Sequence, residues 1–206
     1  MIRIFLADDH PIVRQGVRRT IEEQPDMTVV GEASDGWQVL HADDRASWDV
    51  LVLDLSLPTI SGIEVLRRLH AELPRLRVLV LSMYAEEQYA SRLLAAGAAG
   101  YVSKDEPPSA VLAAIRAVAA GRAWFSPEVL EALQHRRPEQ AHERLSAREY
   151  QVFTLLVAGR SVSEIASELN VAGSTVSNHV TKIREKLGAR TVGEIIRYAH
   201  QAGFLS

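Results

Sequence analysis

The 206-residue sequence contains no cysteine, which excludes disulfide bonds, thiolate catalysis and cysteine-ligated zinc sites. It has no apolar run near the roughly 20 residues that a membrane-spanning helix needs. Acidic residues begin at Asp8, too early for the apolar core of a signal peptide. The sequence therefore predicts a protein of the cytoplasm, a reducing compartment, with no membrane association.

A strong charge of either sign is also missing, because the net charge of the whole chain is only −3. The total conceals different parts: residues 1–122 carry a net charge of −4, residues 123–142 of −1 and residues 143–206 of +2. The apolar share of 47% and the charged share of 24% are ordinary for globular domains, which excludes long disorder. We therefore expect an acidic folded part followed by a mildly basic one.

Five short apolar segments recur along the first part, and segments with helical spacing of apolar residues separate them. The five segments are 2–7, 28–31, 50–53, 77–81 and 100–102. Alternation of strands and helices predicts βαβ units, a parallel sheet and helices on both of its faces. Residues 1–122 are therefore expected to form one α/β domain.

The rest of the chain carries no strand signal. Within the segment 123–143, residues 136–140 are polar and include Pro138, which is typical of a linker, and Pro127 suits the start of a short helix. Residues 144–206 contain three capping boxes, a signature of helix N-termini. The boxes pair Ser146 with Glu149, Ser161 with Glu164 and Thr191 with Glu194. We expect an all-α domain of four short helices, at about 146–158, 162–169, 173–187 and 191–202.

Acidic residues lie where the first and third predicted strands end. Asp8 and Asp9 follow the first strand, and Asp54 follows the third. With the strand order 2-1-3-4-5, these ends are neighbours at the edge of the sheet where ligands bind. Such a cluster of carboxylates needs a cation to relieve its repulsion, and oxygen ligands suit Mg²⁺.

Two further residues complete this constellation. Ser82 ends the fourth strand and offers a hydroxyl group, while Lys104 follows the fifth and brings a positive charge. A metal, a lysine and a hydroxyl around one carboxylate make a site for a phosphoryl group, with Asp54 as the nucleophile. Taken singly, the Asp8–Asp9 pair and Ser82 read as helix caps and Lys104 as a solvated side chain, so the inference depends on their joint placement.

Two enzyme classes are poorer alternatives. A haloacid-dehalogenase-like phosphatase also uses an aspartate nucleophile, but it carries an Asp-x-Asp pattern at the end of its first strand, whereas Asp54 is followed by Leu55 and Ser56. A dinucleotide-binding enzyme needs a glycine-rich loop after the first strand, where this chain has Asp8, Asp9 and a His-Pro pair. We therefore expect a protein that is not an enzyme.

Residues 1–122 resemble a response-regulator receiver domain, which has a flavodoxin-like (βα)5 fold. The resemblance rests on Asp54 with Pro58 and Gly62 after it, on the sequence Asp-Asp-His-Pro at 8–11, and on residues 99–104. It implies that Asp54 accepts a phosphoryl group from a sensor histidine kinase. It also implies roles for the remaining residues. Asp8, Asp9, Asp54 and the backbone carbonyl of Ser56 would hold Mg²⁺ or Mn²⁺. Ser82 and Lys104 would bind the phosphate, and Tyr101 would pack inward when they do so.

Residues 145–206 resemble the LuxR-type helix-turn-helix output domain of NarL/FixJ response regulators. The match is carried by segments 145–149, 165–169 and 175–180. It implies binding of double-stranded DNA through the helix at 173–187, and RNA polymerase becomes a candidate partner. The implied DNA contacts are Thr175, Ser177, Asn178, His179, Thr181, Lys182, Arg184 and Lys186. Ser177 and Thr181 stand where the family often has basic residues, and Ala172 where a Ser or Thr cap is usual, so we expect fewer phosphate contacts.

A single helix-turn-helix binds weakly, so we expect an active homodimer that reaches two DNA half-sites. The last helix has an apolar side, part of which must belong to the domain core, while the region of Ile196 and Ala199 could pack against its copy. The alternative is a helix whose apolar side packs only within its own domain. That side consists of Val192, Ile195, Ile196 and Ala199. One alternative stays open at this stage: a receiver domain that is no longer phosphorylated and serves only as a dimerisation module.

Overall fold

The computed structural model describes residues 1–84, 86–134 and 141–204. The chain divides into two compact units, Met1–His135 and Arg136–Ser206. The polar segment 136–140 of the predicted linker, including Pro138, lies entirely outside the described residues. Over the described part of the chain, no helix combines the length and the apolar character needed to cross a membrane.

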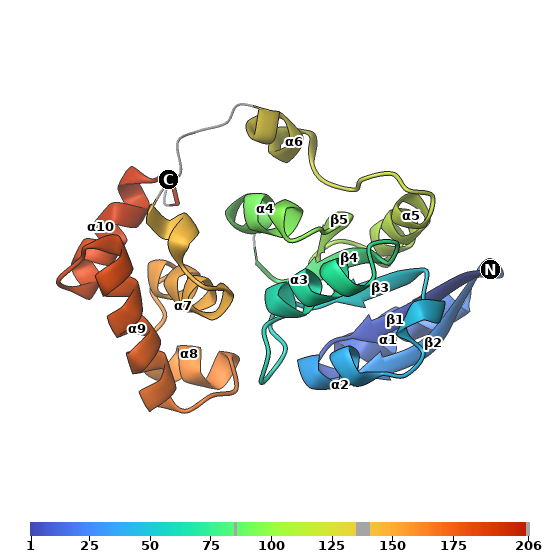
Figure 1. Ribbon diagram of the computed structural model, residues 1–206, viewed down its shortest axis with the longest axis horizontal. Coiled ribbons are helices and arrows are strands. Elements are labelled where there is room, and N and C mark those ends of the chain that lie inside the picture. Colours follow the sequence, from blue (N-terminus) through green and yellow to red (C-terminus); the bar gives the residue numbers. More distant parts are fainter. Residues whose placement is uncertain (85, 135–140, 205–206) are drawn as a thin grey trace. The chain divides into compact units, whose positions relative to one another are not determined.

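The first unit contains a five-stranded parallel sheet in the order β2-β1-β3-β4-β5, which confirms the strand order and the fold expected for this part (Figure 1). Its strands are β1 (Ile2–Ala7), β2 (Met27–Ala33), β3 (Val50–Leu53), β4 (Arg77–Ser82) and β5 (Gly100–Ser103). β3 lies in the middle of the sheet, and its four side chains are all buried, as an apolar strand covered on both faces requires. The carboxyl ends of β1 and β3 therefore lie side by side.

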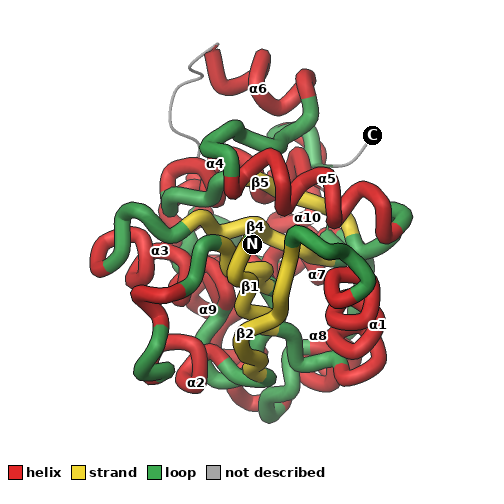
Figure 2. Tube along the Cα trace, turned by 90° about the vertical axis from the view of Figure 1, so that its right-hand side faces the viewer, coloured by secondary structure: helices red, strands yellow, loops and turns green. Residues whose placement is uncertain are grey.

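Helices cover both faces of the sheet (Figure 2). One face packs against α1 (Pro11–Glu22) and α5 (Pro108–Ala119), where Ile4 and Leu6 alternate with residues that point to the other side. The opposite face carries the remaining helices of the sheet. These are α2 (Gly36–His41), α3 (Gly62–Glu72) and α4 (Glu86–Ala95). A short 3-10 turn at Arg45–Ser47 precedes β3.

The segment after α5 is also part of the first unit. The backbone N–H of Tyr101 donates to the carbonyl of Trp124, so this segment covers the exposed edge of β5. The Glu86 carboxylate accepts a hydrogen bond from the backbone N–H of Ser126 at 3.0 Å. The next helix, α6 (Pro127–Gln134), begins at the proline that predicted it and contacts α4.

Over its described residues, 141–204, the second unit contains helices and no strand. They are α7 (Ala147–Val157), α8 (Val162–Glu168), α9 (Gly173–Leu187) and α10 (Val192–Gln201), preceded by a 3-10 turn at Ala141–Arg144. The capping boxes at Ser146 and Ser161 are formed as predicted. At the third box the Thr191 hydroxyl accepts from the N–H of Glu194, but the Glu194 carboxylate accepts from the N–H of Arg190. Only one half of that box matches the prediction.

The loop after β3 is fastened to α2. Thr59 has a φ of +61°, a left-handed conformation that a β-branched residue rarely adopts. Its hydroxyl donates to Asp35 Oδ2 at 2.8 Å, while Asp35 Oδ1 accepts the backbone N–H of Trp37 and caps α2. This contact holds the loop that follows Asp54 in one shape.

Candidate functional site

The three predicted carboxylates converge at the carboxyl ends of β1 and β3. Asp8 is 5% exposed and Asp54 is 2% exposed, so two of the three lie almost out of water. Ligand atoms of Asp8, Asp9, His10 and Asp54 all lie within 4.8 Å of one another. Chain order and sheet order together thus produce one compact acidic cluster, as the sequence predicted.

Lys104 joins this cluster from the end of β5. Its Nζ lies 2.6 Å from Asp54 Oδ2 and 2.8 Å from Asp8 Oδ2, and its side chain is 4% exposed. Burial is the largest single influence and opposes the charged form of Lys104, but the carboxylates of Asp54 and Asp8 together outweigh it and raise the pKa of the lysine. Burial also raises the pKa of the Asp54 carboxyl, and Asp8 adds to that while Lys104 opposes it. The lysine therefore stays a cation and bridges two carboxylates.

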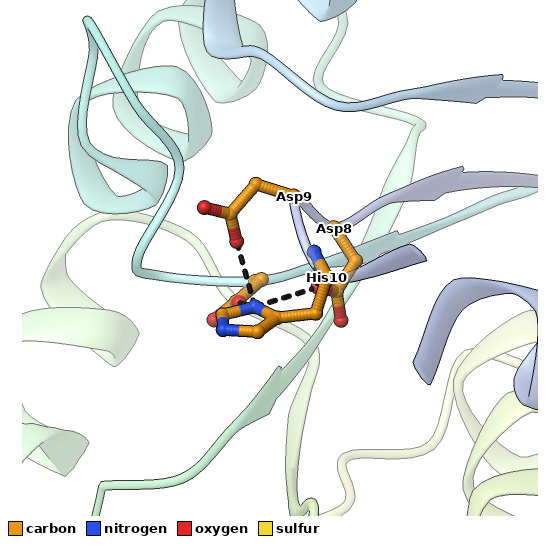
Figure 3. Close-up of side chains that lie close together, drawn as sticks. Asp8, Asp9 and His10 are labelled. Carbon is orange, nitrogen blue, oxygen red and sulfur yellow. Dashed lines mark hydrogen bonds and ion pairs between the residues drawn. The ribbon is translucent and has the colours of Figure 1, made fainter. Parts of the chain in front are cut away.

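His10 was part of a sequence motif but had no predicted role. Its Nδ1 lies 2.8 Å from Asp9 Oδ1 and 3.3 Å from Asp8 Oδ1, directed into the acidic cluster (Figure 3). The residue precedes Pro11, the first residue of α1, and its backbone N–H donates to Asp8 Oδ1 at 2.8 Å. The short distance in sequence between His10 and the Asp8–Asp9 pair was the only available signal for this contact.

Ser82 and Tyr101 lie on the neighbouring strands β4 and β5. Ser82 is fully buried and its hydroxyl accepts a hydrogen bond from the backbone N–H of Tyr84 at 3.4 Å. Tyr101 is 4% exposed, so its ring lies inward, and its hydroxyl donates to the carbonyl of Tyr84. The sequence had not indicated Tyr84, which also accepts a hydrogen bond from the Ser56 hydroxyl at 3.2 Å. Tyr84 thus connects both residues to the loop that follows Asp54.

The arrangement suits chemistry on a phosphoryl group. Asp54 offers one carboxylate oxygen to Lys104, and its other oxygen, Oδ1, accepts the backbone N–H of Ser56 at 3.1 Å. The three carboxylates of the cluster supply the oxygen donors that Mg²⁺ prefers. A buried nucleophile beside a fixed ammonium group is the arrangement that an acyl phosphate needs.

In the second unit, α9 presents one buried and one exposed side. Val176 and Ile183 are fully buried, while Val180 and Leu187 are partly buried, so the predicted apolar stripe faces the domain interior. Polar side chains occupy the outer side. Those exposed are Thr175, Ser177, Asn178, Thr181, Lys182 and Lys186, with His179 and Arg184 partly buried. This pattern gives α9 a polar outer surface of the kind that contacts a groove of nucleic acid.

Several of these outer residues already have partners. The hydroxyls of Ser177 and Thr181 donate to backbone carbonyls one turn back, at 3.0 and 3.2 Å. In that rotamer each hydroxyl presents its oxygen as an acceptor. Lys186 Nζ lies 2.6 Å from Glu149 Oε2, so without DNA this lysine forms an ion pair within the helical domain. Burial, followed by the charge of Arg148, lowers the pKa of His179, which makes this residue a neutral ring at pH 7.

Comparison with known proteins decides the family. Residues 4–116 match the response regulator receiver domain, and residues 143–199 match the bacterial regulatory proteins of the luxR family. The chain is a response regulator.

Relatives of this response regulator share its full length. The transcriptional regulatory protein MctR of Rhizobium johnstonii is 36% identical over 100% of this chain and 96% of its own. The response regulator UvrY of Escherichia coli is 32% identical over 98% of this chain and 95% of its own. Both domains are therefore found together in proteins of the same organisation.

Solved structures agree with this assignment. The response regulator ChrA of a heme-sensing two-component system is 37% identical, with a TM-score of 0.54 over 99% of this chain and 98% of its own. RcsB from Salmonella enterica serovar Typhimurium, bound to the promoter P1flhDC in the presence of the phosphomimetic BeF3−, is 28% identical, with a TM-score of 0.64 over 97% of this chain and 98% of its own. The protein is a two-component response regulator with a LuxR-type DNA-binding domain, in a family of transcription regulators.

The residues expected to mediate dimerisation of this response regulator need a correction. Ile195 and Ala199 are fully buried in the core of the helical domain, so they cannot pack against a second copy. Val192 and Ile196 remain 39% and 37% exposed. The apolar residues of the last helix therefore form two neighbouring stripes. The inner stripe packs into the core of the helical domain, and the outer stripe is partly exposed.

Lys186 provides a test of its structural role. Burial alone would raise the pKa of Glu149, but hydrogen bonds from Lys186 and from Ser146 lower it below its ordinary value. A lowered pKa in the folded state stabilises the fold above the unfolded pKa of about 4.3 and loses that effect as the pH falls through the folded value. Lys186→Met should therefore cost about 1 kcal/mol at pH 7, since water partly screens the pair, and less below about pH 4.

Urea denaturation over this pH range measures the effect, with the exposed Lys182→Met as matched control. An equal loss of stability in both variants, or a loss that does not depend on pH, would contradict the pairing of Lys186 with Glu149.

Proposed function

We propose that this response regulator is switched by phosphorylation of Asp54, and that the phosphorylated form binds specific DNA through α9. The observation that carries the proposal is the contact of Lys104 with both Asp54 and Asp8, because a buried nucleophile with its cation already in place is arranged for phosphoryl transfer. The buried Ser82 hydroxyl on the next strand end supplies the remaining phosphate ligand.

The donor of the phosphoryl group is the phosphohistidine of a sensor histidine kinase. A carboxylate oxygen of Asp54 forms a bond to phosphorus as the phosphorus–nitrogen bond breaks, and the released imidazole takes up a proton. The Lys104 ammonium group then turns from the carboxylates to the new phosphoryl oxygens, because these carry the greater negative charge. Each residue of the cluster thus has a role before or after transfer.

Asp8, Asp9 and Asp54, together with the backbone carbonyl of Ser56, would hold Mg²⁺. Their oxygen donors and their burial fit this ion, since three carboxylates and one lysine leave an excess of negative charge. When bound, the ion neutralises the charge of the transferring phosphoryl group.

The signal leaves the site through Ser82 and Tyr101. A Ser82 hydroxyl that donates to phosphate must change its bond with Tyr84, and Tyr84 is also the partner of Tyr101. Ser82 ends β4, Tyr84 lies in the loop before α4 and Tyr101 lies on β5, so phosphorylation would shift the equilibrium between two conformations of this part of the receiver. A difference of about 1.4 kcal/mol between the two forms changes their ratio tenfold, so few contacts suffice.

Phosphorylation then favours a homodimer that places two copies of α9 on two half-sites of double-stranded DNA. Thr175, Ser177, Asn178 and Thr181 would face base edges, while Lys182 and Arg184 supply phosphate contacts. Val192 and Ile196 are the exposed apolar residues of α10 that a second copy could cover. Because the kinase donates the phosphoryl group and DNA is the target, this activity belongs in the cytoplasm. RNA polymerase would be the partner that follows DNA binding.

The proposal is tested by selecting genomic fragments on the full chain, with and without a small phosphodonor and Mg²⁺. We expect a defined set of sites whose occupancy rises about tenfold or more on phosphorylation. Enrichment of the same sites to the same level in both conditions would favour the alternative of a phosphorylation-independent dimerisation module. Enrichment of no site would overturn the assignment of α9.

A further inference from the structure

His10 occupies the N-cap of α1 without capping it. An N-cap side chain ordinarily accepts a hydrogen bond from the first turn of its helix, and the described structure gives His10 no such bond. Pro11 at the first helical position fixes the backbone there instead. The imidazole ring is directed at the carboxylates, with Nδ1 2.8 Å from Asp9 Oδ1 (Figure 3).

The distances around this nitrogen are those of ligands that share one ion. Nδ1 lies 3.3 Å from Asp8 Oδ1 and 3.9 Å from Asp54 Oδ2, and each of the four residues offers one atom within 4.8 Å of all the others. An octahedral divalent ion with bonds of about 2.1 Å sets adjacent ligand atoms about 3 Å apart and opposite ones about 4.2 Å apart. The His10 nitrogen therefore stands at a ligand distance from every carboxylate of the cluster.

We propose that His10 is a nitrogen ligand of the divalent ion in this site, and that it shifts the preference of the site from Mg²⁺ toward Mn²⁺. The proposal rests on the metal site of the proposed function and concerns which ion that site takes. Mg²⁺ prefers oxygen ligands and retains its waters, whereas imidazole suits first-row transition ions. The His10 side chain is 57% exposed, so its ring stands on the solvent side of the cluster.

A second role for His10 makes the opposite prediction. As a protonated counter-ion to Asp8 and Asp9, the ring would compete with any divalent cation. Its removal would then strengthen the binding of Mg²⁺ and Mn²⁺ alike. As a ligand, its removal weakens Mn²⁺ selectively.

The test uses Mn²⁺ with the full chain, read by electron paramagnetic resonance. Wild-type protein should show pulsed-resonance modulation from a directly bound ¹⁴N nucleus, and His10→Gln should lose it. The same variant should bind Mn²⁺ about tenfold more weakly and change its affinity for Mg²⁺ less than about threefold. His200→Gln, at an exposed histidine of α10, is the matched control and should change neither signal nor affinity. Asp8→Asn should weaken both ions, which places the bound ion in the cluster.

Absence of nitrogen modulation in the wild type, or tighter binding of both ions by His10→Gln, would overturn the proposal. Failure of the proposed function gives a different result: no acid-labile phosphate on the wild type in Mg²⁺. The two outcomes are measured independently, because Mn²⁺ binding is read without any phosphodonor.

Discussion

Asp54→Asn is expected to reduce acid-labile phosphate incorporation from a small phosphodonor by about a hundredfold or more. The amide keeps the volume of the carboxyl group but has no anionic oxygen to attack phosphorus. We do not expect Asp8 or Asp9 to replace it, because the proposed function assigns both to the divalent ion. Asp54 holds Lys104 on Oδ2 and the N–H of Ser56 on Oδ1, while Asp8 shares the same lysine. The incorporation is measured on the full chain in Mg²⁺, with hydroxylamine release to verify an acyl phosphate.

Asp49→Asn is the matched control for this experiment. Asp49 directly precedes β3 at the opposite end of the same strand, is exposed, and accepts a hydrogen bond from the backbone N–H of Arg3. We expect this variant to incorporate phosphate like the wild type. Equal incorporation by Asp54→Asn and the wild type would refute Asp54 as the phosphoacceptor.

Lys104→Met is expected to destabilise the receiver domain by about 2–4 kcal/mol in metal-free buffer at neutral pH. The lysine is 4% exposed and lies between two buried carboxylates, so its loss leaves Asp54 and Asp8 without their nearest cation. A divalent ion in the cluster restores most of that electrostatic balance. Added Mg²⁺ should therefore stabilise the variant more than the wild type, as measured by urea denaturation with and without the ion.

The same variant should still accept phosphate but lose the response of DNA affinity to phosphorylation. The reason is that the proposed function assigns Lys104 to the phosphoryl oxygens after transfer. Lys182→Met removes an exposed lysine and should leave the stability of the receiver unchanged. A Lys104→Met protein as stable as the wild type without metal would contradict the bridging role of this lysine.

The acidic cluster could be predicted because a parallel sheet brings strand ends together. Asp8, Asp54 and Lys104 each directly follow a strand, and the order β2-β1-β3-β4-β5 then determines that they meet. The capping residues Ser146 and Ser161 could be predicted for a similar reason, since a cap acts on N–H groups only two or three residues away. The strand order was therefore sufficient to predict the acidic cluster, and the local capping pattern was sufficient to predict the two caps.

Contacts that depend on loop shape and side-chain rotamers could not be predicted. Tyr84 reaches Ser56 from a different loop, and the ring of His10 could equally have capped α1 or faced water. The apolar residues of α10 illustrate a second limit. Helical spacing shows that Ile195 and Ile196 lie near one side, but only the packed domain shows that Ile195 is inside and Ile196 partly exposed.

Lys186 shows the same limit for charge. Its position on α9 made it a candidate for DNA phosphates, yet 37 residues separate it from Glu149, its partner in the structure. The sequence shows which cations lie on a helix, but it does not show which of them form ion pairs within the same domain. The cations left for DNA on the described part of α9 are therefore chiefly Lys182 and Arg184, which makes dimerisation more important for affinity.

The most direct test of the account is the affinity of the full chain for one selected DNA site, measured by fluorescence anisotropy at fixed salt with and without phosphodonor and Mg²⁺. Phosphodonor should tighten binding by the wild type about tenfold or more and leave the affinity of Asp54→Asn unchanged. An identical dissociation constant for the wild type in both conditions, with phosphate incorporation verified in the same sample, would contradict the account.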